Sequence, residues 1–280
     1  MKVSVSSYSF SQLLDSGMVQ PANLIRLAKE IGFAAIEYTD FNLPKDPAQL
    51  RDESEKQSLP IVCYAVCADF LKADSVEAEA ERLFAQVDIA AALGAKKLRH
   101  DATNGFPTAR AKYSGFREAL PILARGCRMV TEYAAAKGIA TMVENHGYFC
   151  QDSTRLAALV GAVAHPNFGA LVDIGNFLCA DEDAAVAVGN VAAMAKHVHA
   201  KDFHRKSGAA ENPGEGWFNS RGGNYLRGAI IGHGEVPVRQ CMQVLKRSGY
   251  DDFVSIEFEG MEACEQALHI GRANLERFFD

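Results

Sequence analysis

Short runs rich in valine, isoleucine, alanine and cysteine alternate with longer stretches of helical pattern along this 280-residue chain. The runs predict eight strands, at residues 2–9, 34–39, 60–67, 96–101, 139–145, 169–174, 196–201 and 253–258. The stretches predict eight helices, at residues 21–31, 46–57, 76–93, 110–137, 153–163, 183–194, 238–248 and from 262 to the last residue. Glycine follows several of these helices, as expected at helix ends: Gly32, Gly94, Gly138 and Gly249.

Strands joined by crossover helices predict a parallel sheet, and eight such units that close on themselves form a (β/α)₈ TIM barrel. A barrel of this class needs about 250 residues, so we expect an α/β fold with one domain spanning residues 1–280. The competing fold is a doubly wound open sheet. That fold usually carries a glycine-rich phosphate-binding turn after its first strand, and this chain has none there.

Composition excludes several classes of protein. Hydrophobic residues make up 48% of the chain, which suffices for a large core. The net charge is −6 and the basic residues are scattered, which argues against a nucleic-acid partner. The sequence shows no secretory segment and no apolar run of about 20 residues, so we expect a cytoplasmic protein without a membrane partner. The seven cysteines lack zinc-site spacing and are expected to be reduced and mostly buried.

One connection is much longer than the others, from about residue 204 to 236. It holds eight glycines and the only tryptophan, Trp217. Long loops inside a compact domain are usually functional or disordered. Because this one follows the seventh strand, on the face where barrels build their active sites, we expect a lid rather than a disordered insertion.

Four strand ends carry side chains that bind metals: Glu144, Asp173, His199 and Glu257. Alternation along each strand places all four inside the barrel, because their immediate neighbours form the apolar face that suits the helix layer. Taken singly, a glutamate at a strand end more often caps a helix or meets solvent, and a histidine in a strand is more often a core residue. Three buried carboxylates without a cation would repel one another, so together the residues predict a divalent metal site.

Five segments resemble the sugar phosphate isomerase/epimerase superfamily of xylose isomerase-like barrels. They are Val143-Glu144-Asn145, Val172-Asp173-Ile174-Gly175-Asn176, His197-Val198-His199-Ala200-Lys201-Asp202, Gly232-His233-Gly234-Glu235 and Ile256-Glu257-Phe258-Glu259-Gly260. The resemblance covers essentially the whole chain. It is specific for the superfamily and weak for any one member.

The resemblance implies one bound divalent ion, most often Mn²⁺, with Co²⁺, Mg²⁺ or Zn²⁺ as alternatives. It also implies a small-molecule sugar substrate, catalysis by Glu144 and Glu257 as acid and base on opposite faces of the sugar, and a homodimer or homotetramer. The chain departs from the epimerase pattern at Asn176, where those enzymes have a histidine. This departure weakens the transfer of substrate contacts but not of metal ligands.

Chemically, a carboxylate can remove a proton next to a carbonyl while a cation stabilises the enediolate, and a second carboxyl can return the proton. Further polar residues near strand ends are candidate substrate contacts: Glu37, His100, His146, Lys201 and His233. For Glu37 a supporting role is favoured over direct contact. Lys201 could neutralise the carboxylates, and Arg99 could bind a phosphate or pair with Asp101.

The leading hypothesis is therefore a metal-dependent isomerase or epimerase of a small sugar or sugar derivative. A keto-inositol or polyol dehydratase on the same metal site is the nearest alternative, since it would abstract the same kind of proton. An abasic-site endonuclease would need more metal ligands and a basic face. A binding module without catalysis would keep the fold but show no turnover.

Overall fold

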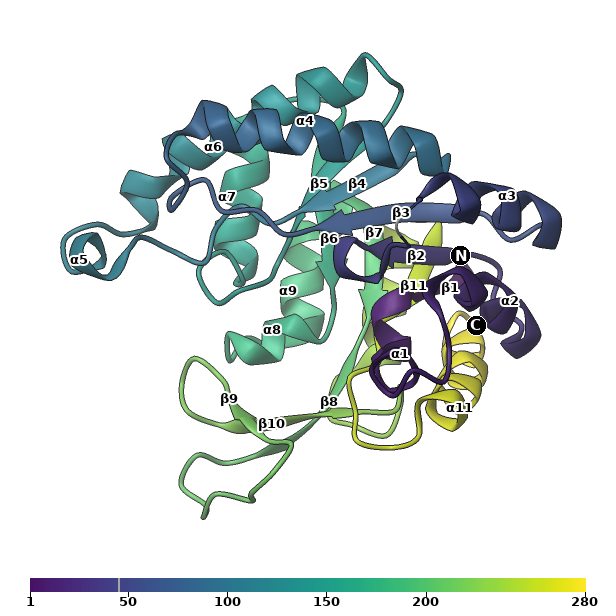
Figure 1. Ribbon diagram of the computed structural model, residues 1–280. Coiled ribbons are helices and arrows are strands. Elements are labelled where there is room, and N and C mark those ends of the chain that lie inside the picture. The colour runs from purple at the N-terminus through teal and green to yellow at the C-terminus, as the bar shows by residue number, and fades with distance from the viewer. Residues whose placement is uncertain (45) are drawn as a thin grey trace.

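Eight short, largely buried strands close into a barrel in the computed structural model, which describes residues 1–44 and 46–280 (Figure 1). The barrel strands are β1 (Lys2–Ser6), β2 (Ile36–Thr39), β3 (Ile61–Val66), β4 (Lys97–His100), β5 (Ala140–Glu144), β6 (Phe168–Asp173), β7 (Ala195–Ala200) and β11 (Phe253–Ile256). Every neighbouring pair is parallel, and β1 closes the ring against β11. The eight predicted strands and the predicted TIM barrel are thus confirmed.

The helices cover the outside of the barrel, as the crossover pattern requires (Figure 1). The long ones are α2 (Leu24–Ile31), α3 (Ala48–Gln57), α4 (Val76–Leu93), α6 (Phe116–Ala135), α7 (Ser153–Val163), α9 (Ala184–Val191), α10 (Val238–Arg247) and α11 (Cys264–Phe278). Side chains of Ser75, Asp152 and Asp183 accept backbone hydrogen bonds at the starts of α4, α7 and α9. Within the described residues, every helix is too short or too polar to span a bilayer.

Two predicted elements differ from the structure in more than the position of their ends by a residue or two. The first strand ends at Ser6, because residues 7–10 turn into a 3₁₀ helix that leads to the short α1 (Ser11–Asp15). The predicted helix 110–137 is divided into α5 (Thr108–Ala111) and α6. Gly115 takes an extended conformation between them, and the Glu118 carboxylate accepts a hydrogen bond from its N–H at 2.9 Å. This hydrogen bond caps the start of α6, so a new helix begins after Gly115.

The barrel interior is filled in layers. Cys63, Met142 and Leu171 form a small apolar group inside it. A polar layer includes Ser4 and Ser255, whose hydroxyls are 2.8 Å apart. All seven cysteines are free thiols, and most are buried, as the sequence predicts.

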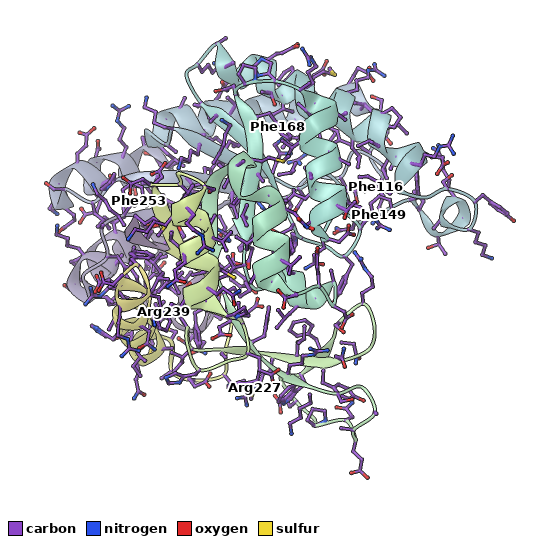
Figure 2. The ribbon with its side chains drawn as sticks, turned by 180° about the vertical axis from the view of Figure 1, so that it is seen from behind. Phe116, Phe149, Phe168, Arg227, Arg239 and Phe253 are labelled. Carbon is purple, nitrogen blue, oxygen red and sulfur yellow. The ribbon has the colours of Figure 1, made fainter. Side chains whose placement is uncertain are left out.

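The long connection after β7 is not the loop that was expected. It forms a three-stranded antiparallel sheet of β8 (Asp202–Lys206), β10 (Tyr225–Ala229) and β9 (Phe218–Asn219), which projects beyond the barrel (Figure 1). Phe203 and Leu226 are buried together with Cys179 of the short helix α8 (Asn176–Cys179), which gives the sheet its own apolar contact. Arg227 of β10 lies on this sheet (Figure 2), and its guanidinium is 5.5 Å from the centre of the Trp217 ring. We call residues 202–229 the lid sheet.

Candidate metal centre

Four ligand-type side chains meet at the carboxyl end of the barrel. Glu144 and Asp173 are the last residues of β5 and β6, His199 lies near the end of β7, and Glu257 directly follows β11. Each offers one atom within 4.8 Å of the others. From Nδ1 of His199, the distances are 3.8 Å to Glu144 Oε1, 3.9 Å to Asp173 Oδ2 and 3.6 Å to Glu257 Oε1. The structure thus brings together the residues that strand alternation pointed inward.

The donor atoms fit a divalent cation. Ligand atoms at about 2.1 Å from one ion lie roughly 3–4 Å from one another, which is the spacing around His199. Asp173 Oδ2 and His199 Nδ1 are buried and have no hydrogen-bond partner among the described residues. Buried polar atoms without a partner are costly, and a shared cation would satisfy both. Three oxygens and one nitrogen form a set that suits Mn²⁺ or Mg²⁺.

Backbone and amide groups fix the carboxylates. Asp173 Oδ1 accepts hydrogen bonds from the N–H groups of Gly175 at 2.8 Å and Asn176 at 3.0 Å, which leaves Oδ2 for the centre. Asn176 Nδ2 donates to Glu144 Oε1 at 2.9 Å. The residue at which this chain departs from the epimerase pattern therefore orients a candidate ligand.

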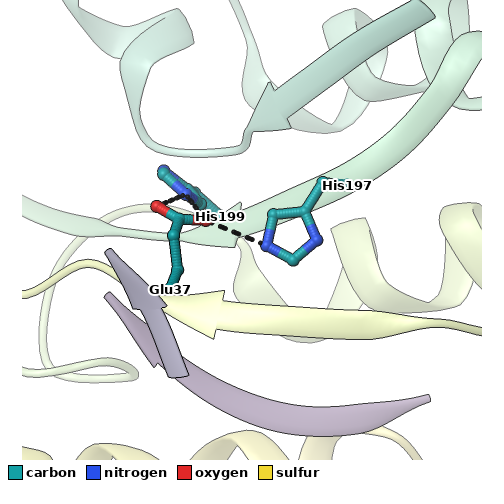
Figure 3. A group of neighbouring side chains, drawn as sticks. All are labelled: Glu37, His197 and His199. Atoms are coloured by element: carbon teal, nitrogen blue, oxygen red, sulfur yellow. Dashed lines mark hydrogen bonds and ion pairs between the residues drawn. The ribbon is translucent and has the colours of Figure 1, made fainter. Parts of the chain in front are cut away.

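Glu37 supports the centre from deeper in the barrel (Figure 3). His199 Nε2 lies 2.9 Å from its Oε1, and His197 Nε2 lies 3.1 Å from its Oε2. If Nε2 of His199 carries the proton donated to Glu37, the lone pair of Nδ1 faces the other three ligands. Burial lowers the pKa of the His199 imidazole, but Glu37 and Glu257 raise it well above the usual value, so an ion would have to displace a proton from Nδ1.

Two buried cations neutralise the carboxylates. Lys201 Nζ is 2.5 Å from Glu257 Oε2 and 3.3 Å from Asp173 Oδ2. Arg99 Nη2 is 2.7 Å from Glu144 Oε2 and 2.8 Å from Asp101 Oδ1. Burial raises the pKa of Asp173 to about 6, against the opposing effect of Lys201. Each of the two candidate catalytic glutamates is thus held by its own cation.

The centre opens into two adjoining chambers. The cluster chamber, of about 150 Å³, is lined by Glu144, His199 and Glu257. The side chamber, of about 330 Å³, is lined by Lys201 and Asn176 and by Phe218 of the lid sheet. Tyr8, His146 and Glu259 line both chambers, so the two adjoin. The lid sheet supplies a wall of this cleft.

The predicted substrate contacts divide into two groups. His146 and Lys201 line the cleft, and His146 Nδ1 lies 3.1 Å from Asp101 Oδ1. Glu37 is buried behind His199 and supports it, as favoured from the sequence.

The structure contradicts two of the predicted substrate contacts, His100 and His233. His100 is fully buried on the helix side of β4, between Phe70 and Phe168, with Nδ1 2.8 Å from the Asp101 carbonyl. It points outward because Arg99, its neighbour in the strand, points inward. His233 is exposed in the turn after β10 and lines neither chamber.

The cleft residues missed as site residues include Arg99, Glu259 and Tyr8. Arg99 was weighed only as a phosphate ligand or as a partner of Asp101. Glu259 shares the inward face of Glu257, which is a signal that the alternation pattern already contained. Tyr8 was placed in a strand, and its position in the cleft follows from the unpredicted 3₁₀ turn at residues 7–10.

Comparison with known proteins identifies the family. The family model described as xylose isomerase-like TIM barrel matches residues 25–277. The chain belongs to this family. No curated protein matches the chain by sequence.

Solved structures show the same fold within this family at low identity. A probable 3-DHS dehydratase from Bacillus anthracis is 19% identical with a TM-score of 0.74, over 100% of this chain and 99% of that one. A D-allulose 3-epimerase from Methylomonas sp. is 16% identical with a TM-score of 0.75, over 99% and 98%. A xylose isomerase-like barrel protein from Mycobacterium smegmatis in complex with magnesium is 16% identical with a TM-score of 0.73, over 99% and 96%.

Proposed function

We propose that the protein is a divalent-metal-dependent isomerase or epimerase of a small sugar or sugar derivative. One observation carries the proposal. Three carboxylates and one imidazole converge at the mouth of the barrel, and two of their buried atoms, Asp173 Oδ2 and His199 Nδ1, make no hydrogen bond among the described residues. The similarity to a D-allulose 3-epimerase and to a magnesium complex supports the reaction class and the cofactor class.

Glu144, Asp173, His199 and Glu257 would hold the ion. When bound, a divalent cation would supply Lewis-acid stabilisation of negative charge that develops on the substrate oxygens. Glu144 and Glu257 approach the cleft from different strands, so one can take the proton next to the carbonyl and the other can return it. Arg99 and Lys201 hold these carboxylates in place through their ion pairs. Asp173 and His199 would act as metal ligands and take no part in the proton transfer.

The test follows deuterium from solvent into candidate substrates. The Mn²⁺-loaded protein is incubated in D₂O with a panel of ketoses, aldoses and inososes, and the products are analysed by NMR and mass spectrometry. Deuterium on carbon next to a carbonyl, without loss of water, is the expected result. Loss of water would instead assign the dehydratase reaction, which the similarity to a probable dehydratase makes the second candidate.

The Glu257→Gln variant is the matched control for this experiment. It keeps the shape of the side chain but removes a carboxylate that accepts protons and faces the ion. We predict that turnover falls at least about 100-fold, the usual contribution of a positioned general base. Circular dichroism should show an unchanged fold. Full activity in this variant would exclude Glu257 from the chemistry.

A further inference from the structure

The side chamber is more than twice as large as the cluster chamber, at about 330 Å³ against about 150 Å³. Pockets for small molecules typically measure about 300–1,000 Å³, so the cluster chamber alone falls below this range. A substrate confined to the cluster would leave the larger chamber filled with water. The volume therefore indicates a ligand that extends beyond the reacting group.

Two aromatic rings face solvent at the side chamber. Tyr148 is 43% exposed and Phe218 is 36% exposed, and both line the chamber. Such rings present flat apolar faces on which another ring can stack. They come from the loop after β5 and from the lid sheet, and the hydroxyl of Tyr148 donates to the carbonyl of Asn219, the residue next to Phe218.

Tyr148 is held in a costly conformation. Its φ of 61° lies in the left-handed region, which non-glycine residues rarely adopt. Three contacts hold it there. Its N–H donates to Gln151 Oε1 at 2.7 Å, its hydroxyl donates to the Asn219 carbonyl at 2.6 Å, and its own carbonyl accepts from Arg221. Two of these partners belong to the lid sheet, so the sheet fixes the ring at the chamber.

We propose, on the basis of the proposed function, that the substrate is a keto sugar held in a glycoside or in a similar conjugate, so that its reacting ring keeps the carbonyl that proton abstraction requires. Its sugar ring reacts at the metal cluster, and its second ring stacks on Tyr148 and Phe218 in the side chamber.

The test compares binding of matched ligands, which does not require turnover. Affinities of the Mn²⁺-loaded protein are measured by titration calorimetry for methyl and phenyl glycosides of glucose, galactose and xylose, and for cellobiose and lactose. We expect at least one phenyl glycoside or disaccharide to bind roughly 3- to 10-fold more tightly than its methyl counterpart, as one stacked ring contributes. Whether the phenyl ring or the second sugar gives the gain identifies the conjugate.

Variants at the two rings test whether the gain in affinity arises in the side chamber. Tyr148→Asn keeps a residue that tolerates the left-handed backbone, and Phe218→Ala removes the other ring without touching that backbone. Each variant should reduce the preference for the phenyl glycoside or disaccharide over the methyl glycoside. The affinity for the methyl glycoside should stay unchanged. Tyr113→Asn, at an 86% exposed tyrosine that lines neither chamber, should leave the preference intact.

Two outcomes separate this proposal from the proposed function. If no conjugate binds better than its methyl counterpart, or if the preference survives in both variants, the substrate class is wrong, even where free ketoses exchange deuterium. If conjugates bind through the side chamber but neither free keto sugars nor keto-sugar glycosides exchange deuterium, the chamber stands as a binding site and the isomerase reaction is wrong.

Discussion

Glu37 shows how a single residue outside the cleft can control a metal centre. Its carboxylate accepts a hydrogen bond from His199 Nε2 at 2.9 Å, and this bond orients Nδ1 towards the other three ligands. Removing the carboxylate partner of a metal-binding histidine typically lowers metal affinity 10- to 100-fold. We predict a loss of about this size for Glu37→Gln in a Mn²⁺ titration. Exposed Glu30→Gln on α2 is the control. Equal affinities would mean that the β7 backbone alone positions His199.

His100 makes a prediction about pH at the same scale. Burial lowers the pKa of its imidazole to about 4, whereas an unfolded histidine titrates near 6.5. Between these values the unfolded chain binds a proton that the folded protein does not. The contribution of His100 to stability is therefore complete above about pH 6.5 and declines as the pH falls towards 4. By pH 5 the loss is about 2 kcal/mol in the free energy of unfolding.

The variant His100→Phe isolates this group. It keeps a ring between Phe70 and Phe168 but cannot take a proton. Urea denaturation at pH 7 and pH 5 should show a decline smaller by about 2 kcal/mol than in the native sequence. The lost hydrogen bond to the Asp101 carbonyl lowers stability at both pH values and leaves the difference unaffected. The same decline in both proteins would place the acid sensitivity elsewhere.

Single residues also show what the sequence could predict of the site. Period-two alternation and position at strand ends place Glu144, Asp173, His199 and Glu257 correctly, because each strand fixes its own faces. The contact between Glu37 and His199 joins residues 162 positions apart. It depends on the register of the strands around the barrel, which a local sequence pattern does not predict. Lys201 remained ambiguous because its neighbours come from other strands.

At the scale of elements, Asp181 anchors one turn of the lid sheet to the barrel. Asp181 accepts hydrogen bonds from Ser220 Oγ and Asn224 Nδ2, both at 2.7 Å, and from the N–H of Gly222. Asp181→Asn keeps a residue that tolerates its φ of 58° but removes one acceptor and the charge. We predict faster amide hydrogen exchange in β9 and β10, with protection in the barrel strands unchanged.

A matched surface variant completes that experiment. Asp74→Asn, on the exposed segment before α4, should leave exchange in the lid sheet as it is. Unchanged exchange in Asp181→Asn would mean that the ion pair of Arg221 with Asp152 is sufficient to hold the turn.

The same sheet marks the limit of predicting elements from sequence. Barrel strands were found because each is a dense apolar run with helices on both sides. The strand β9 has two residues, and β8 continues β7 after one residue, so neither forms a separate run. The glycines of this connection lie largely at turns between these strands. The sheet is defined by pairing across the connection, such as Phe203 with Gly228, and not by local composition.

For the whole molecule, the four candidate ligands connect β5, β6, β7 and β11, so a bound ion would link half of the barrel strands. A ligand that binds only the folded state stabilises it by about 2.7 kcal/mol at 100 times its dissociation constant. For a chain of this size, that stabilisation raises the melting temperature by about 5 °C. We predict this shift for Mn²⁺ in a calorimetric scan, with reversal by EDTA. Asp173→Asn should lose most of it, since the variant retains the fold but weakens the site. A shift of the same size in that variant would place the stabilising ion outside the cluster.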